Sequence, residues 1–357
     1  MFKILDRYIL KQFFQTYFFT VLLLVLVVSV IDYSEKSDDF LGVPLESIFF
    51  DYYLNFFLFV ANLVTPIIVF IATVFVTARL AGRTEIIAML SGGMSFRRVM
   101  WPYFIGSALI ALTTFFLNGW VTPRANATKA AFELKYIKSP FRFEERNFHV
   151  RIDSNTYAYV QNYNNALRTG YKFTLERIEN LRLLEKFSTD VIRWDTAQNA
   201  WHADRYQIHY FDGQDERIER GFDLDTTIAL TPEDFESKHL LHESLTLPEL
   251  DQYIAEELER GNSNLGVFWV EKYQRYASPF AIIILSMMGV IVASRKSRQG
   301  TSFQIALGFV LSFVFLLLAI IGRSIGEAGG AHPYLAVWLP NVVFALVAVW
   351  MYRKVPK

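Results

Sequence analysis

Six long apolar stretches dominate the hydrophobic pattern of the chain. They cover about residues 13–31, 56–78, 99–121, 277–294, 303–322 and 334–352. A bilayer core about 30 Å thick needs roughly 20 apolar residues in a helix, and each stretch meets or nearly meets that length. The first follows three basic residues, as a signal peptide would, but it is long and has no small-residue cleavage site after it. The pattern therefore predicts six transmembrane helices.

Basic residues gather at one end of these predicted spans. The four clusters contain Lys3, Arg7, Lys11, Arg79, Arg83, Arg97, Arg98, Arg295, Lys296, Arg298, Arg353, Lys354 and Lys357. Six spans place all four clusters on the same side, and an excess of Lys and Arg marks the cytoplasmic side of a membrane protein. We therefore expect both termini in the cytoplasm and the middle of the chain on the opposite, periplasmic side.

The chain between Pro123 and Pro248 follows a different pattern and contains no segment able to span a membrane. After a helical lead-out over 124–145, short β-branched and aromatic runs alternate with turn signals: NFHVRI, TYAYVQNY, YKFTLERI, VIRWD, WHADRYQIHYF and TTIAL. Such spacing is typical of an antiparallel sandwich, a jellyroll or a partly open barrel. We expect residues 145–230 to form a jellyroll with an apolar groove and a pairable edge strand. Thr246 and Glu249 then predict a capping box that opens a helix ending at Gly261.

These patterns define the fold class and its parts. We predict a polytopic α-helical membrane protein of six transmembrane helices with an inserted periplasmic all-β, jellyroll-like domain. The predicted boundaries are 1–122 for the first three spans, 123–262 for the β domain with its helical connectors, and 263–357 for the last three spans.

Composition narrows the chemistry. The 357 residues are 53% hydrophobic, carry no net charge and include no cysteine. Disulfides and thiol catalysis are thereby excluded, and a neutral chain gives no reason to expect nucleic acid as a partner. The six histidines lack metal-ligand spacing, and no GxxxxGK[ST] loop is present to bind ATP. We therefore expect no metal, no cofactor and no catalytic site.

The segment TARLAGRTEIIAMLSGGMSFRRV, residues 77–99, lies between the second and third spans. Thr84 is a candidate N-cap, Glu85 suits the first turn of a helix, and Gly92–Gly93 would end it. Ile86, Ile87, Met89 and Leu90 supply an apolar surface. A helix over about 84–91 could lie on the lipid surface or dock into a groove of a cytoplasmic partner. The second interpretation suits a coupling helix of an ABC transporter whose ATPase is another chain.

Charged residues also stand at the outer ends of the spans. Asp32, Glu35 and Lys36 follow the first apolar run, Arg323 and Glu327 end the fifth, and VEKYQRY at 270–276 precedes the fourth. Charges at membrane depth are costly and tend to line cavities or pathways, but residues at a membrane surface also reach into water. Both interpretations remain open from the sequence.

Four motifs together resemble the LptF/LptG family of lipopolysaccharide-export permeases. They are LDRYILKQF, GRTEIIAMLSGGMSFRRV, PELDQYIAEELERG and EKYQRYASPFAIIILSMMGV, and the order of three spans, β domain and three spans is also similar. The LDRY start and the WLPNVVFALVAVW end resemble the LptG branch more than the LptF branch. The resemblance implies an inner-membrane permease that pairs with an LptF-like paralogue on an LptB-like ATPase dimer. Such a complex extracts lipopolysaccharide and passes it to LptC- and LptA-like periplasmic proteins.

The resemblance also implies site residues. The ATPase-coupling residues would be Arg83, Glu85, Ile86, Met89 and Leu90, with Glu85 meeting a basic residue of the ATPase. A lipid gate between the first span of one permease and the fifth of the other would include Phe18, Leu22, Val25, Ile31, Asp32, Lys36, Leu317 and Arg323. This chain departs from the family in having only Lys36 as a basic residue at the outer end of the first span. The alternative hypothesis is a mechanotransmitting adaptor that couples a cytoplasmic ATPase to periplasmic partners without moving lipid.

Overall fold

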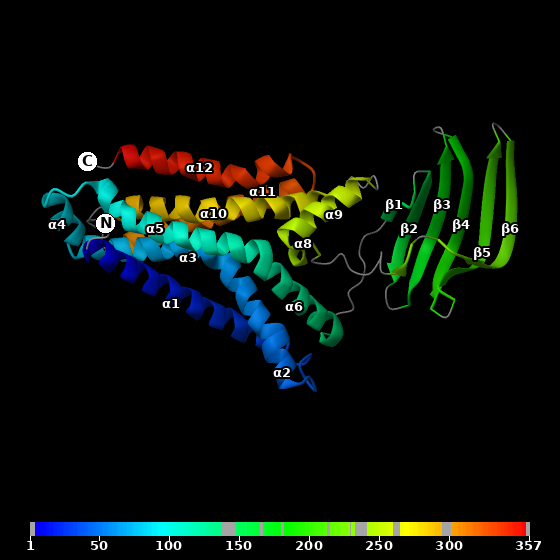
Figure 1. Ribbon diagram of the computed structural model, residues 1–357, viewed down its shortest axis with the longest axis horizontal. Coiled ribbons are helices and arrows are strands. Elements are labelled where there is room, and N and C mark those ends of the chain that lie inside the picture. The colour runs from blue at the N-terminus through cyan, green and yellow to red at the C-terminus, as the bar shows by residue number, and fades with distance from the viewer. Residues whose placement is uncertain are drawn as a thin grey trace. The chain divides into compact units, whose positions relative to one another are not determined.

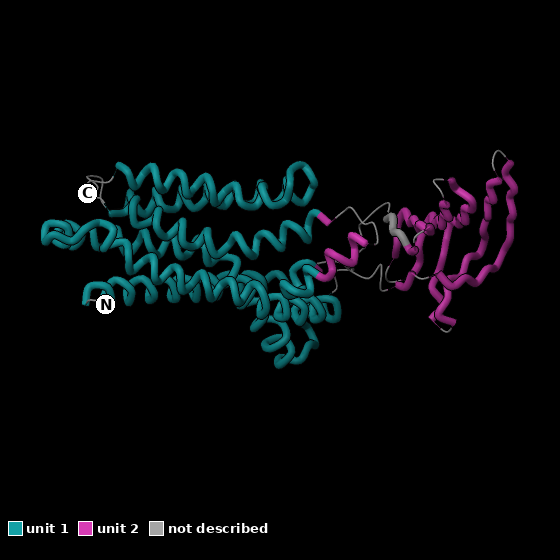
Figure 2. The backbone as a smooth tube through the Cα atoms, turned by 45° about the horizontal axis from the view of Figure 1, so that its top comes forward, with its two compact units in different colours: residues 1–137, 242–251, 266–357 teal, residues 138–241, 252–265 magenta. Residues whose placement is uncertain are grey.

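The computed structural model describes residues 4–137, 148–153, 155–164, 167–179, 182–196, 198–212, 215–228, 230–232, 241–259, 265–294 and 301–354. Its backbone divides into two compact units, coloured separately in Figure 2. Residues 1–137, 242–251 and 266–357 form the helical unit. Residues 138–241 and 252–265 form the β unit.

The helical unit confirms the six predicted spans (Figure 1). Its elements are α1 (Ile4–Glu35), α2 (Leu45–Ser47), the π-helix η1 (Ile48–Tyr53), α3 (Leu54–Gly82), α4 (Glu85–Ser91), α5 (Phe96–Phe116), the π-helix η2 (Leu117–Val121), α6 (Thr122–Tyr136), α10 (Gly266–Ala293), α11 (Thr301–Glu327) and α12 (Pro333–Arg353). Most of α8 (Leu241–Ser244) and the first part of α9 (Leu247–Glu259) also belong to it, whereas Leu241 and α9 from Gln252 onward fall in the β unit. Several helices continue past the apolar stretches because polar residues extend them at their ends. The predicted lead-out helix ends at Tyr136, and Gly261 lies outside the described residues.

Helices α3 and α10 form the centre of the helical unit. In the most apolar 18-residue stretch of each span, 56% of the residues are buried for α3 and 61% for α10, compared with 17% for α1 and 22% for α11. Small side chains allow this close approach, since a Cβ added at Gly289 of α10 would lie 3.1 Å from Phe70 of α3. Thr73 Oγ1 and Ser286 Oγ also lie 3.1 Å apart across the contact. The two central helices therefore carry most of the packed core.

The β unit contains a six-stranded antiparallel sheet. Its strands are β1 (Phe148–Arg151), β2 (Thr156–Asn164), β3 (Thr169–Glu179), β4 (Arg182–Asp195), β5 (Ala200–Asp212) and β6 (Asp215–Thr226), and they pair in sequence order. The predicted inserted all-β fold is confirmed. Among the described strands every connection joins sequence neighbours, so they form a meander and show none of the crossovers that a jellyroll in the strict sense requires.

One face of the sheet carries the hydrophobic core of the β unit. Ala158, Val160, Phe173, Phe187 and Trp201 are buried on this face. Trp201 Nε1 donates a 2.7 Å hydrogen bond to the carbonyl of Leu230, which covers part of the same core.

Two strand predictions need correction. The sequence predicted a strand over 191–195, but β4 already begins at Arg182, and the predicted strand over 226–230 is replaced by β6, which ends at Thr226. The added part of β6 is rich in charged residues and mostly exposed, and charged residues interrupt the apolar ones in the added part of β4, so neither stretch has the apolar run that marks a buried strand.

Candidate functional site

The short helix α4 lies between the ends of α3 and α5. Its C-terminus is a Schellman motif, in which Gly93 adopts a left-handed φ of 83°. The Met94 amide donates to Met89 O at 3.1 Å and the Gly93 amide to Leu90 O at 3.0 Å. The predicted stop at the glycine pair is therefore confirmed.

The start of α4 corrects the predicted cap. Thr84 has a left-handed φ of 61°, its side chain makes no capping hydrogen bond, and its hydroxyl donates to the Arg83 carbonyl at 2.6 Å. An N-cap normally has extended backbone, which directs its side-chain oxygen at the first free amides. A left-handed conformation is unfavourable for a β-branched residue, so Thr84 makes a sharp, strained turn between α3 and α4.

The two faces of α4 have different roles. Ile86 is only 1% exposed and packs into the main core of the helical unit. Ile87, Leu90 and Arg83 are exposed, and Met89 is half-buried. The expectation that Ile86 contributes to a docking surface is corrected, because this residue holds α4 onto the bundle. The remaining face is available to another molecule.

Glu85 has two contacts within the chain. Its Oε2 accepts a hydrogen bond from the Tyr8 hydroxyl of α1 at 3.2 Å, and its Oε1 lies 3.9 Å from Arg83 Nη1. The carboxylate is half-buried, and the long ion pair with an exposed arginine is weak. Glu85 thus connects α1 to α4 and keeps part of its carboxylate accessible.

The predicted gate residues of α1 fall into two groups. Phe18, Leu22 and Ile31 are exposed, as a lipid-facing or subunit-facing surface requires. Val25 is only 1% exposed and packs against Phe56 and Val60 of α3. Its expected position in a cavity is corrected, since the helix presents one side to α3 and the other outward.

Asp32 and Lys36 form a compact network at the end of α1. Lys36 Nζ donates to Asp32 Oδ1 at 2.7 Å, contacts the Tyr52 hydroxyl and lies 3.7 Å from Glu133 Oε1. Asp32 Oδ2 accepts from the Tyr52 hydroxyl at 3.0 Å. The single basic residue at this end is therefore already surrounded by carboxylates and a phenol.

Leu317 and Arg323 lie on α11. Leu317 is exposed. Arg323 Nε donates to Glu327 Oε1 at 2.7 Å, one turn further along, and its Nη2 lies 3.7 Å from Glu271 Oε2 of α10. Like Lys36, Arg323 already has carboxylate partners within the chain.

Arg275 of α10 extends this arrangement into a buried network. Its guanidinium donates to Glu271 Oε1 at 3.0 Å and to the carbonyls of Leu245 and His242 at 2.6 and 3.0 Å. The Arg275 side chain is nearly inaccessible to solvent. It therefore fastens the segment around α8 to the centre of the bundle and also holds the carboxylate that faces Arg323.

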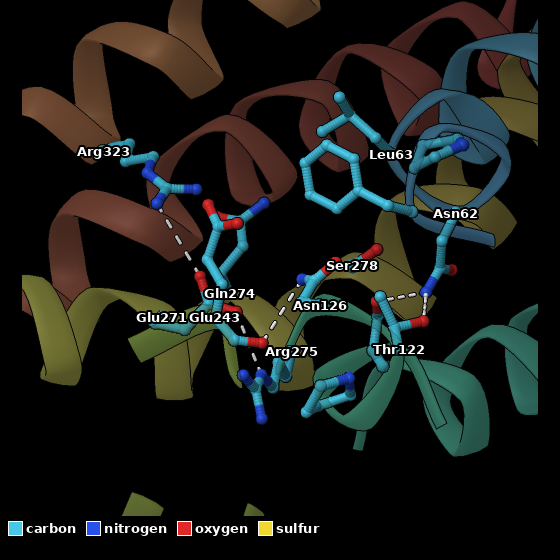
Figure 3. A pocket seen from close by; sticks show the side chains of 14 residues that line it. Asn62, Leu63, Thr122, Asn126, Glu243, Glu271, Gln274, Arg275, Ser278 and Arg323 are labelled. Atoms are coloured by element: carbon cyan, nitrogen blue, oxygen red, sulfur yellow. Dashed lines mark hydrogen bonds and ion pairs between the residues drawn. The ribbon is translucent and has the colours of Figure 1, made fainter. Parts of the chain in front are cut away.

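A polar cavity of about 150 Å³ lies beside this network (Figure 3). It is lined by Phe59, Asn62, Leu63, Pro66, Asn118, Thr122, Pro123, Asn126, Glu243, Glu271, Gln274, Arg275, Ser278 and Arg323. Asn62 Nδ2 donates to Thr122 Oγ1 at 2.8 Å, and Asn126 Nδ2 donates to the Glu243 carbonyl at 3.3 Å. The Oδ1 atoms of both buried asparagines accept no hydrogen bond within the described residues. The volume and polarity suit ordered water.

Two titratable groups of α8 have shifted pKa values in this environment. Burial lowers the pKa of the His242 imidazole. Burial raises the pKa of the Glu243 carboxyl, and the nearby charge of Glu271 acts in the same direction. Both shifts favour the neutral forms. Within the described part of the chain, no group of three or more His, Asp or Glu residues is placed to hold a metal ion.

Sequence analysis identified Glu271, Arg275 and Arg323 of this cavity but neither Glu243 nor the cavity itself. The motif VEKYQRY contains Glu271 and Arg275, whose interfacial or functional role the sequence left open. Asn62, Asn126 and Glu243 gave no local signal, because their chain segments meet only in the fold. The Glu249 half of the predicted capping box is confirmed, since the Thr246 amide donates to Glu249 Oε2 at 2.8 Å.

Six membrane-length helices and an inserted antiparallel sheet define a multi-pass membrane protein. The model of the family described as "Lipopolysaccharide export system permease LptF/LptG" matches residues 7–354, and the chain belongs to this family. It is similar to the lipopolysaccharide export system permease protein LptG of Escherichia coli K12 and to that of an O6:H1 strain of the same species. Each is 20% identical over 370 residues, covering 99% of this chain and 99% of the relative.

Proposed function

We propose that the chain is a permease subunit that extracts lipopolysaccharide from the inner membrane and passes it to a periplasmic bridge. It would work with an LptF-like permease, an LptB-like ATPase dimer, and LptC- and LptA-like proteins. Both termini and α4 would face the cytoplasm, and the β unit would lie in the periplasm. Family membership and the distribution of basic residues support this proposal.

The observation that best supports the proposal is that the other helices of the unit leave one side of α1 and of α11 exposed. Both spans expose large apolar residues, among them Phe18, Leu22 and Leu317. Lipopolysaccharide has several acyl chains and is too wide for a pore between six helices of one subunit. It must enter sideways between helices of two subunits, where apolar walls accept the acyl chains. The outward faces of α1 and α11 suit such walls.

Helix α4 supplies the mechanical connection in this proposal. Its exposed face and the accessible part of Glu85 would dock into a groove of the ATPase. The buried Ile86 and the Tyr8 hydrogen bond would pass motion of α4 to the core and to α1. Movement at the ATPase would thereby reach a gate-forming span directly.

The β unit would hand on the lipid by joining other sheets. Strand β6 stands at one end of the strand order, and it exposes Ile218 and Phe222. An edge strand offers unpaired backbone groups to a partner strand. A photo-crosslinker at Ile218 should therefore capture an LptC- or LptA-like protein, and capture of neither would contradict strand addition at this edge.

The adaptor hypothesis is the second candidate, and one observation favours it. Lys36 and Arg323 were the basic residues expected to meet lipid phosphates, and both are paired with carboxylates of the same chain. A phosphate would have to replace a carboxylate at each position. An adaptor that moves no lipid needs no such exchange.

Photo-crosslinking in the assembled complex separates the two functions. Crosslinkers at Phe18, Ile31 and Leu317 should capture lipopolysaccharide, with a yield that falls once ATP drives export. A crosslinker at the buried Val25 is the matched control on the same helix and should capture α3 instead. Lipid capture that is equal at Val25 and Phe18 would indicate a loosened helix. Crosslinks to protein alone, unchanged by ATP, would favour the adaptor.

A further inference from the structure

An open groove lies at the basic end of the helical unit, and none of its lining residues belongs to the sites described above. Its lining residues are Arg97, Met100, Trp101 and Phe104 of α5 together with Tyr352 of α12. Positions 97, 100, 101 and 104 share one face of a helix, because they are three, four and seven residues apart. The groove therefore presents one guanidinium at its end and apolar side chains along the next two turns.

The guanidinium of Arg97 is held in place but not neutralised. Arg97 Nε donates to the Tyr352 hydroxyl at 2.9 Å, and the Tyr352 ring stacks on buried Phe96 with centroids 6.3 Å apart. Within the described residues Arg97 is in no ion pair, whereas its neighbour Arg98 pairs with the buried Asp6. The two consecutive arginines thus differ in role. Arg98 forms an ion pair within the chain, whereas the exposed guanidinium of Arg97 can bind an anionic ligand.

The walls of the groove are suited to a hydrocarbon chain. Trp101 and Phe104 are exposed and stack on each other, with centroids 5.7 Å apart. Exposed aromatic residues near the end of a span typically lie at the membrane–water boundary. The surroundings add positive charge, because Arg353 and Lys354 follow Tyr352 directly. A ligand complementary to this groove has an apolar chain and an anionic head.

We propose that this groove binds an anionic phospholipid. One acyl chain lies along Met100, Trp101 and Phe104, and the headgroup phosphate meets Arg97, whose guanidinium Tyr352 orients. Arginine suits a phosphate because its planar fork donates two parallel hydrogen bonds. Basic pockets between membrane helices bind anionic lipid headgroups in the same way. This inference does not depend on which substrate the permease moves.

Native mass spectrometry of the purified full chain in mild detergent tests the proposal. Phosphatidylglycerol and phosphatidylcholine with identical acyl chains are titrated separately, and we expect phosphatidylglycerol to bind more tightly. Arg97→Gln should weaken phosphatidylglycerol binding about tenfold and phosphatidylcholine binding by a smaller factor, because the choline cation offsets the charge of that lipid's phosphate. Arg79→Gln removes an exposed arginine at the same end of the unit, outside the groove, and should change neither. Equal losses in both variants would show unspecific charge attraction and overturn the proposal.

Two further variants separate the parts of the ligand. Tyr352→Phe keeps every charge but removes the hydroxyl that orients Arg97, so phosphatidylglycerol binding should weaken about threefold. Trp101→Ala should weaken both lipids by the same factor. Complete competition by inorganic phosphate at the lipid's concentration would identify a plain anion site and contradict the lipid assignment. Capture of a protein subunit by a photo-crosslinker at Trp101 in the assembled complex would also contradict it.

Discussion

Helices α3 and α10 differ from α1 and α11 in what covers them. The first pair is surrounded by the helical unit and meets through Gly289, Thr73 and Ser286. The second pair packs along one side only and exposes large aromatic and aliphatic residues on the other. All four helices are apolar, so hydrophobicity alone does not distinguish them. The helices that pack against each of them do, since α3 and α10 are covered from several sides and α1 contacts mainly α3 and α5.

The difference indicates that packing around α3 and α10 stabilises the fold, whereas α1 and α11 provide surface for contacts with other molecules. Between lipid-embedded helices, close packing and interhelical hydrogen bonds hold the contact, because lipid tails are as apolar as leucine. Small residues such as Gly289, Thr73 and Ser286 make that packing possible where α3 meets α10. Large residues on α1 and α11 are instead available to another subunit or to lipid. Two substitutions test this division and two more test the surfaces beside it, in order of decreasing expected effect.

The largest effect should come from Arg275→Ala on α10. The substitution leaves the Glu271 carboxylate and two backbone carbonyls without their donor in a buried site. Breaking a buried ion pair typically costs about 3–5 kcal/mol, so the midpoint of thermal unfolding in detergent should fall sharply. Arg323→Ala is the control on α11, where the side chain is more accessible, and should cost clearly less. Equal falls in the unfolding midpoint for both variants would contradict the proposed difference between α10 and α11.

A smaller loss should follow from Gly289→Leu at the contact of α10 with α3. The added side chain would collide with Phe70 and Thr73, whose atoms lie 3.1–3.2 Å from the position of its Cβ. Overpacking of this kind costs about 1–3 kcal/mol. Leu22→Phe enlarges a residue on the exposed face of α1 and should leave the stability of the isolated chain nearly unchanged. Both effects are read from denaturant unfolding followed by tryptophan fluorescence.

Glu85→Ala should affect assembly and leave folding intact. A charge-assisted contact with a partner arginine is worth roughly 1.5–3 kcal/mol, so affinity for the ATPase should fall about tenfold or more. Its internal contacts, a hydrogen bond with Tyr8 and a long ion pair with Arg83, add little to stability. Affinity is measured by pull-down of the ATPase at graded concentrations. Normal docking and normal ATP-driven lipid release would remove Glu85 from the coupling surface.

The smallest effect concerns Glu243→Gln beside the cavity. Because burial raises the pKa of this carboxyl, ionised Glu243 destabilises the folded state, fully so above its folded pKa. That cost disappears as the pH falls toward the unfolded value. The variant should therefore be more stable than the wild type at pH 8, with little difference at pH 4.5. The lowered pKa of His242 makes acid destabilise both proteins, and because His242 Nε2 lies 3.9 Å from Glu243 Oε1, the comparison is made in a His242→Gln background. A difference that grows on acidification would contradict the assignment.

The sequence predicts this fold well wherever an apolar pattern repeats along a helix or strand and turn residues mark its end. The six spans, the α4 stop at Gly93 and strands such as Thr156–Asn164 follow from local periodicity and turn chemistry. Partners are harder to predict. Val25 and Ile86 are as apolar as their exposed neighbours, and only the packing of α3 and the core determines which side is covered. Asn62 and Glu243 meet at one cavity because distant segments converge, which no local pattern encodes.

The sequential order of strands β1 to β6 has a consequence for how the protein is made. Every described strand pairing lies within residues 148–226, and none requires a segment from the last three spans. Contacts between sequence neighbours close short loops and form fast. The sheet can thus grow hairpin by hairpin while synthesis of α10 to α12 is still under way. A half-made permease would already carry a nearly finished β unit, which shortens the time its strand edges remain open to aggregation.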